Sequence, residues 1–147
     1  MLSILLSFFL IWNIVWSVNF YTYYKFSSGY MKSSVSYIKS GKDYTYTVAS
    51  PVYLSFTGNF ALTNNDNLSI IIWPALFMRG NSEYGVGIYD EKSDSTYRFY
   101  VDKDLKYIQN DDIDYSDSEK KTIQILLKKY QRDLHKMRQL AHDEWKQ

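Results

Sequence analysis

The chain has 147 residues, a length that fits one domain, and its formal net charge is +1 because 17 Lys and Arg oppose 16 Asp and Glu. This balance disfavours nucleic acid as a partner, and the absence of cysteine excludes disulfides and thiolate metal sites. Aromatic residues make up 18% of the chain, including 15 Tyr and 4 Trp, which favours a β-rich binding domain over a helical bundle.

The opening segment, residues 1–24, contains no charged side chain. As a helix it would be about 36 Å long, whereas the hydrocarbon core of a bilayer is about 30 Å thick. Trp12 and Trp16 lie within the segment and further aromatic residues precede Lys25, as in the aromatic belt of a membrane boundary. We predict a transmembrane anchor over residues 1–24. A cleaved leader and the buried helix of a soluble protein remain alternatives.

The distribution of lysines predicts an orientation for this anchor. Lys25, Lys32, Lys39 and Lys42 follow the apolar segment, and no basic residue precedes it. Because positive loops favour the cytoplasmic side, the lysines predict that the following domain lies in the cytoplasm.

Residues 25–147 are predicted to form a single α+β binding domain. A short helix is expected over residues 28–40, where Met31, Val35 and Ile38 have helical spacing and Gly41 follows. The apolar period then changes to two, and polar turn clusters separate the runs. We predict an antiparallel meander sheet of five or six strands, from the runs at residues 43–50, 52–62, 67–73, 84–90, 96–101 and 106–108.

The last segment predicts a long helix. Ser116 and Glu119 have the spacing of a capping box, and an apolar stripe follows it at steps of three and four residues, through Ile123, Leu126, Tyr130, Leu134, Met137, Ala141 and Trp145. A helix with one apolar stripe has to bury it, so we expect this helix to pack on one face of the sheet.

No recognisable catalytic or metal-binding motif is present in the sequence. His135 and His142 lie seven residues apart on the predicted helix, and no third ligand is placed to help them hold a metal. Gly85 and Gly87 lack the third glycine of a dinucleotide-binding motif, and the acidic residues 102–119 do not match a calcium-binding loop. We therefore predict no metal, no cofactor and no enzymatic activity.

Alternation divides the predicted strands between two faces. One face is apolar and is suited to being covered by the long helix; its residues are Leu68, Ile70, Ile72, Val86, Ile88, Phe99 and Val101. The opposite set is rich in Trp, Tyr, Arg and Gly, and we hypothesise that it binds a protein partner. Its candidate site residues are Ile71, Trp73, Gly85, Gly87, Tyr89, Arg98 and Tyr100. The alternative is that the first helix or a loop covers this face, which would make its aromatic residues a second core layer.

The order of these parts resembles a known family. The strands NLSIIIWPALFM, YGVGIYD and TYRFYVDKDLKYI and the final helix ending LAHDEWKQ, behind an uncleaved anchor, resemble the TipC-like immunity proteins that accompany LXG-type toxins of Gram-positive bacteria. The resemblance covers residues 28–147.

The resemblance implies a single-pass cell-membrane protein with its domain outside the cell, against the lysine distribution. It also implies that the domain binds a cognate secreted antibacterial toxin, one that attacks cell-wall precursors, and blocks it by occlusion without catalysis. Two other hypotheses stay open at this point: a structural or accessory subunit of a cell-envelope complex, and a small enzyme or ligand carrier with a pocket between helix and sheet.

Overall fold

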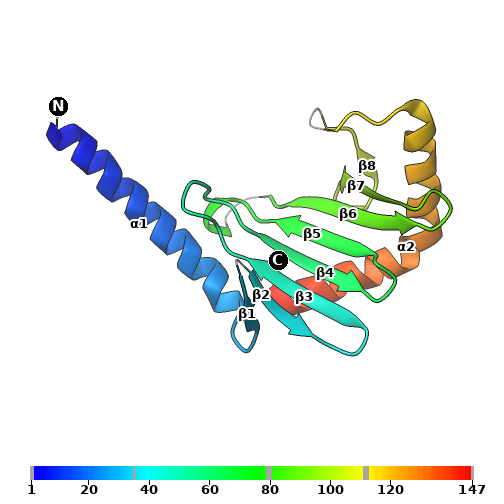
Figure 1. Ribbon diagram of the computed structural model, residues 1–147, viewed down its shortest axis with the longest axis horizontal. Helices are drawn as coiled ribbons and strands as arrows, with labels where there is room; N and C mark the ends of the chain where they lie inside the picture. The colour runs from blue at the N-terminus through cyan, green and yellow to red at the C-terminus, as the bar shows by residue number, and fades with distance from the viewer. Residues whose placement is uncertain (1, 35, 79–80, 111–112, 147) are drawn as a thin grey trace.

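The computed structural model describes residues 2–34, 36–78, 81–110 and 113–146, and it is an α+β structure (Figure 1). Helix α1, Leu2–Phe26, precedes an eight-stranded sheet, and helix α2, Asp117–Trp145, follows it. A short 3-10 helix, η1, Leu76–Met78, separates β5 from β6. The strands are β1 Met31–Ser33, β2 Ser36–Ser40, β3 Tyr44–Ala49, β4 Asn59–Asn64, β5 Ser69–Trp73, β6 Glu83–Asp90, β7 Ser95–Val101 and β8 Tyr107–Ile108.

The sheet is an antiparallel meander, as predicted, but it has more strands than predicted. Its eight strands lie in sequence order, and each pairs antiparallel with the next. The prediction of five or six strands was too low because the chain also forms a hairpin, β1–β2, where a helix was expected.

The helix predicted over residues 28–40 is therefore wrong. Serine is a weak former of helix interiors, and Ser33, Ser34 and Ser36 lie in the middle of this segment. Ser34 takes a φ of 45°, in the turn between the two strands. The ring of Tyr37 in β2 packs against Tyr24 of α1, with 5.9 Å between ring centroids. Val35, part of the predicted helix, lies outside the described residues.

The strand predicted over residues 52–62 is correct only at its end. Asn59–Asn64 pairs with β3 as β4, whereas residues 50–58 form a loop. Pro51 has no N–H to donate to a neighbouring strand, so the segment cannot continue a ladder there. Contacts with α1 hold this loop instead, and they are described below.

The core lies between the sheet and α2. Trp145, Leu134, Met137 and Ala141 of α2 are each 0% exposed. The facing strand residues Phe60, Leu62, Ile70, Ile72, Val86, Ile88, Phe99 and Val101 are buried as well. The predicted apolar face and its coverage by the long helix are thus confirmed.

The predicted capping box also begins α2. The backbone N–H of Ser116 donates to a Glu119 carboxylate oxygen over 2.8 Å, and the Glu119 N–H donates back to the Ser116 hydroxyl over 3.4 Å. At the other end Lys146 closes the helix in the left-handed region, with its N–H donating to the His142 carbonyl.

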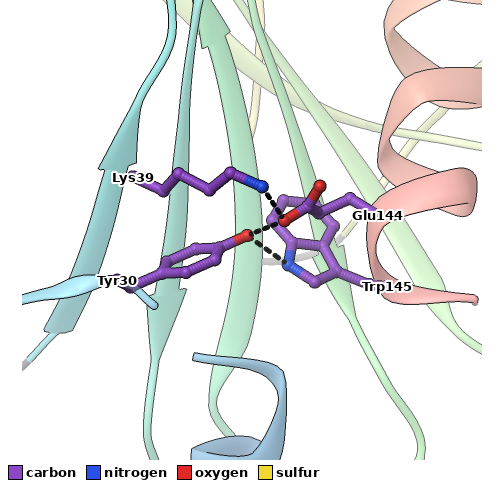
Figure 2. Close-up of polar contacts among 4 residues, drawn as sticks. All are labelled: Tyr30, Lys39, Glu144 and Trp145. Carbon is purple, nitrogen blue, oxygen red and sulfur yellow. Dashed lines mark hydrogen bonds and ion pairs between the residues drawn. The ribbon is translucent and has the colours of Figure 1, made fainter. Parts of the chain in front are cut away.

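A polar cluster joins the two ends of the domain (Figure 2). The Tyr30 hydroxyl, just after α1, donates to the Glu144 carboxylate over 2.8 Å, and Lys39 Nζ lies 2.6 Å from the same oxygen. The Trp145 indole N–H donates to the Tyr30 hydroxyl over 3.2 Å. The chain leaving α1 is therefore fixed to the last turn of α2 and to β2.

Helix α1 projects away from one end of the sheet (Figure 1). The segment Ser3–Phe26 of this helix is long and apolar enough to cross a membrane, and few of its residues are buried. Only its last turns join the core, where Tyr23 is 1% exposed and lies 5.4 Å from the Phe60 ring.

Candidate functional site

The face of the sheet opposite α2 is the candidate site. Figure 1 shows α2 behind the sheet and no helix in front of this face. Residues that point to it, such as Thr47, Ile71, Trp73 and Tyr100, are half-buried, and Arg98 is exposed. Helix α1 and the loop of residues 50–58 do not form the second layer that was the alternative to a binding face.

The register of β5, β6 and β7 brings Trp73, Gly85 and Tyr100 together. Ile71 is the direct partner of Gly85, which is in turn the partner of Tyr100. The Trp73 indole extends over Gly85, because a Cβ there would lie 2.7 Å from the indole ring. Its ring centroid lies 5.3 Å from that of Tyr100. Glycine at position 85 is what allows the two aromatic rings to meet across three strands.

Arg98 supplies an exposed positive charge on this face. Its backbone is fixed at the edge of β7, where the Tyr115 hydroxyl accepts from its N–H over 3.2 Å and donates to its carbonyl over 2.8 Å. Tyr115 thereby takes the place of a neighbouring strand beyond the short β8. Among the described residues the guanidinium has no ion-pair partner, since the one pair found there joins Lys39 and Glu144.

The side chains of this face surround a hollow of about 400 Å³. The hollow is lined by Ala61, Thr63, Ser69, Ile71, Trp73, Gly85, Val86, Arg98, Phe99, Tyr100 and Ile113. Five of the predicted site residues therefore share one concave surface. Tyr100 also borders a larger hollow of about 1010 Å³ at the ends of β6, β7 and β8.

The two other predicted residues lie on the same face but outside the hollow. A Cβ at Gly87 would lie 2.4 Å from the Ser69 hydroxyl, so the Ser69 side chain occupies the space that this glycine leaves. Tyr89 lies near the β6–β7 turn, and its hydroxyl donates to Asp94 over 2.6 Å. That hydrogen bond, followed by burial and by nearby carboxylates, raises the pKa of Tyr89.

Sequence reasoning missed six residues of the hollow, and it had assigned two of them, Val86 and Phe99, to the covered face. Ala61 and Thr63 lie on β4, and Ser69 begins β5. Alternation along these two strands assigns them to the open face, so this signal was available. Ile113 comes from the segment before α2, where it bridges to Asn110, and no periodic pattern indicates its place.

The site offers a concave shape, aromatic surface and one exposed positive charge. The described residues include no cluster of three or more His, Cys, Asp or Glu side chains that could hold a metal. His135 and His142 are exposed on α2, which covers the other face of the sheet.

The fold defines the chain as an α+β protein with an apolar N-terminal helix, an antiparallel sheet covered on one face, and an open second face. No known protein family, curated protein or solved structure matches the chain.

Proposed function

We propose that the chain is a membrane-tethered immunity protein, whose open sheet face binds a secreted antibacterial toxin and blocks it by occlusion. The observation that carries this proposal is the hollow of about 400 Å³ with Trp73, Tyr100 and Arg98 in its lining. Trp, Tyr and Arg are the residues that most often dominate the free energy of protein–protein binding, above all around concave, well-packed pockets.

The geometry supports a simple mode of binding. An apolar side chain of the partner would enter the hollow and contact Ile71 and the two aromatic rings, while a carboxylate beside it would bind Arg98 with a charge-assisted hydrogen bond. Neither contact needs a chemical step. Inhibition would follow because the bound domain covers the surface through which the toxin reaches its target.

The identity of the partner as a toxin rests on the resemblance to TipC-like immunity proteins. That resemblance also places the domain outside the cell, against the distribution of Lys25, Lys32, Lys39 and Lys42. One of these four lysines, Lys39, forms an ion pair with Glu144 in the folded domain. The positive-inside rule acts during membrane insertion, before the domain folds, so this ion pair does not remove the conflict. The outward orientation is therefore part of the proposal.

The site is tested by substitutions on the open face. If a toxin is encoded beside this gene, we expect Arg98→Ala and Tyr100→Ala each to weaken binding to it by about 2 kcal/mol or more, roughly 30-fold in Kd. Isothermal titration calorimetry with the full chain in detergent measures this change. Arg132→Ala is the matched control because Arg132 is exposed on α2, away from the open face.

The controls separate the site from the function. If Arg98→Ala and Tyr100→Ala bind as tightly as the unchanged chain and Arg132→Ala, the open face is not the binding site. If no adjacent toxin exists and replacement of α1 by an unrelated anchor abolishes function, the chain is an accessory subunit of an envelope complex instead. Thermal melting of each variant shows whether the loss of binding reflects a loss of folding.

A further inference from the structure

The loop of residues 50–58 is docked along helix α1. The Trp16 indole N–H donates to the Val52 carbonyl over 3.1 Å, and the Trp12 indole N–H donates to the Tyr53 carbonyl over 3.3 Å. The Trp12 ring lies 4.4 Å from that of Phe56 and meets it edge-on.

Two asparagines of α1 extend these contacts. Asn13 accepts a hydrogen bond from the Tyr53 hydroxyl over 3.0 Å. Asn19, which is 1% exposed, donates to the Phe56 carbonyl and accepts from the Phe77 N–H of η1 over 3.4 Å. Loop and η1 are thus bound to the helix over about two turns, at the end of the sheet from which α1 projects.

The docked loop limits how α1 can enter a bilayer. The described contacts with the loop begin at Trp12 and Asn13, so residues 2–11 extend beyond it. Trp12, Trp16 and Asn19, which contact the loop, lie inside Ser3–Phe26, the span that is long and apolar enough to cross a bilayer. If α1 crosses the membrane with the loop in place, the loop has to enter the membrane beside it.

The surface of the loop suits lipid. Leu54 is 83% exposed and Val52 57% exposed, and Leu76 of the adjacent η1 is 43% exposed. No charged residue occurs between positions 44 and 65 or between 67 and 78. These side chains continue the exposed apolar surface of α1, where Ile4, Phe8 and Ile11 are also more than half exposed.

Several polar groups of the loop have partners within the protein, although the Ser50 hydroxyl is buried without one among the described residues. Backbone groups in lipid need internal partners, because each unsatisfied one costs several kcal/mol there. The carbonyls of Val52, Tyr53 and Phe56 accept from α1 side chains, and the Ser55 hydroxyl bonds to Thr57. Leu54, between these residues, is the most exposed large apolar residue of the loop.

We propose that the loop of residues 50–58 inserts into the lipid bilayer beside α1, so that the two form one membrane-embedded unit. This inference rests on α1 being a membrane anchor, as in the proposed function. The domain is then held against the membrane through two chain segments, and its open face keeps a fixed angle to the bilayer.

The absence of native cysteine allows a direct test with single-cysteine probes. The full chain is reconstituted in phosphatidylcholine–phosphatidylglycerol vesicles with an environment-sensitive fluorophore at Leu54→Cys, at Ile4→Cys or at Lys92→Cys. Lys92 lies in the exposed β6–β7 turn, at the other end of the sheet from α1 (Figure 1). Lipids that carry a nitroxide on the acyl chain then quench only the fluorophores that lie within the bilayer.

We expect quenching at positions 4 and 54 and none at position 92. If the fluorophore at position 4 is quenched and the one at position 54, like that at position 92, is not, the loop does not insert. In that case α1 is still a membrane anchor. If the fluorophore at position 4 is not quenched either, α1 does not lie in the bilayer, and the proposed insertion of the loop is wrong as well. A blue-shifted fluorophore at position 54 that the nitroxide lipids do not quench would show that protein, such as a second copy, covers the loop.

A variant of α1 tests whether the helix holds the loop in the bilayer. Trp12→Phe with Trp16→Phe removes both indole donors and keeps aromatic side chains at both positions. We expect weaker quenching at position 54 and unchanged quenching at position 4. Equal quenching at position 54 with and without the indoles would contradict the docking as the cause of insertion.

Discussion

Among single residues, Tyr30 uses one hydroxyl to join two groups near the end of α2. It donates to Glu144 and accepts from the Trp145 indole, so it satisfies a carboxylate and a buried indole N–H at once. Burial raises the pKa of Tyr30 first, and the hydrogen bond to Glu144 and the negative charge there raise it further. Burial opposes ionisation of Glu144 too, but the hydrogen bonds from Lys39 and Tyr30 keep its pKa below the ordinary range.

Tyr30→Phe is expected to lower the free energy of unfolding by about 1–3 kcal/mol at neutral pH, because the Trp145 N–H loses its buried acceptor. Urea denaturation of the full chain in detergent measures this loss. Tyr97→Phe is the matched control, since the described residues offer its hydroxyl no hydrogen bond. A Tyr30→Phe variant as stable as the Tyr97→Phe variant would contradict this role.

The same cluster predicts the pH dependence of stability. The Glu144 pKa is lowered by folding, so its contribution is present above about pH 4.3 and is lost as the pH falls through the lower folded pKa. The Tyr30 pKa is raised, so its contribution is present below about pH 10 and is lost as the pH rises further. Glu144→Gln should therefore flatten the acid side of a stability profile, and Tyr30→Phe the alkaline side. Profiles with unchanged slopes would contradict this assignment.

At the scale of elements, burial of one stripe of α2 holds the helix on the sheet. Leu134 is 0% exposed, whereas Ile125 on the same helix is 68% exposed. We expect Leu134→Ala to lower the free energy of unfolding by about 2–5 kcal/mol through a buried cavity, and Ile125→Ala to change it little. Thermal or chemical denaturation compares the two, and equal losses would mean that α2 does not pack by this stripe.

The elements differ in how far their sequences determine them. Helix α2 was predictable because Ser116, Glu119 and the apolar stripe all indicate the same structure, and β5 to β7 were predictable from strict alternation. The β1–β2 hairpin was not predictable, because Met31, Val35 and Ile38 have the spacing of a helix. What fixes β2 as a strand is its pairing with β3, which local spacing does not reveal. Residues 52–56 have the composition of a strand, but contacts with distant Trp12 and Trp16 hold them as a loop.

The candidate site was predictable to a similar extent. Alternation placed Ile71, Trp73, Arg98 and Tyr100 on one face, and the register brings all four to one hollow. The packing of Trp73 over Gly85 was not evident from the sequence, because it depends on which residues of β5 and β6 are paired. Gly85 and Gly87, two of the candidate site residues, make room for the Trp73 and Ser69 side chains of this chain.

At the scale of the whole molecule, three parts have different roles: α1, the covered face of the sheet and the open face. The helix holds the chain at a membrane in the proposed account, α2 and one sheet face make the core, and the other face is left to a partner. The cluster around Tyr30 joins the end of α1 to the end of α2 by direct hydrogen bonds.

Site-specific photocrosslinking on intact cells tests whether the open face binds a secreted protein outside the cell. A photoreactive phenylalanine analogue replaces Tyr100 in one variant and Arg132, exposed on α2, in the other. We expect position 100 to capture a single secreted toxin when it is added to the cells, and position 132 to capture none. Capture of the toxin from position 132 but not from position 100, or of nothing from either until the cells are lysed, would contradict it.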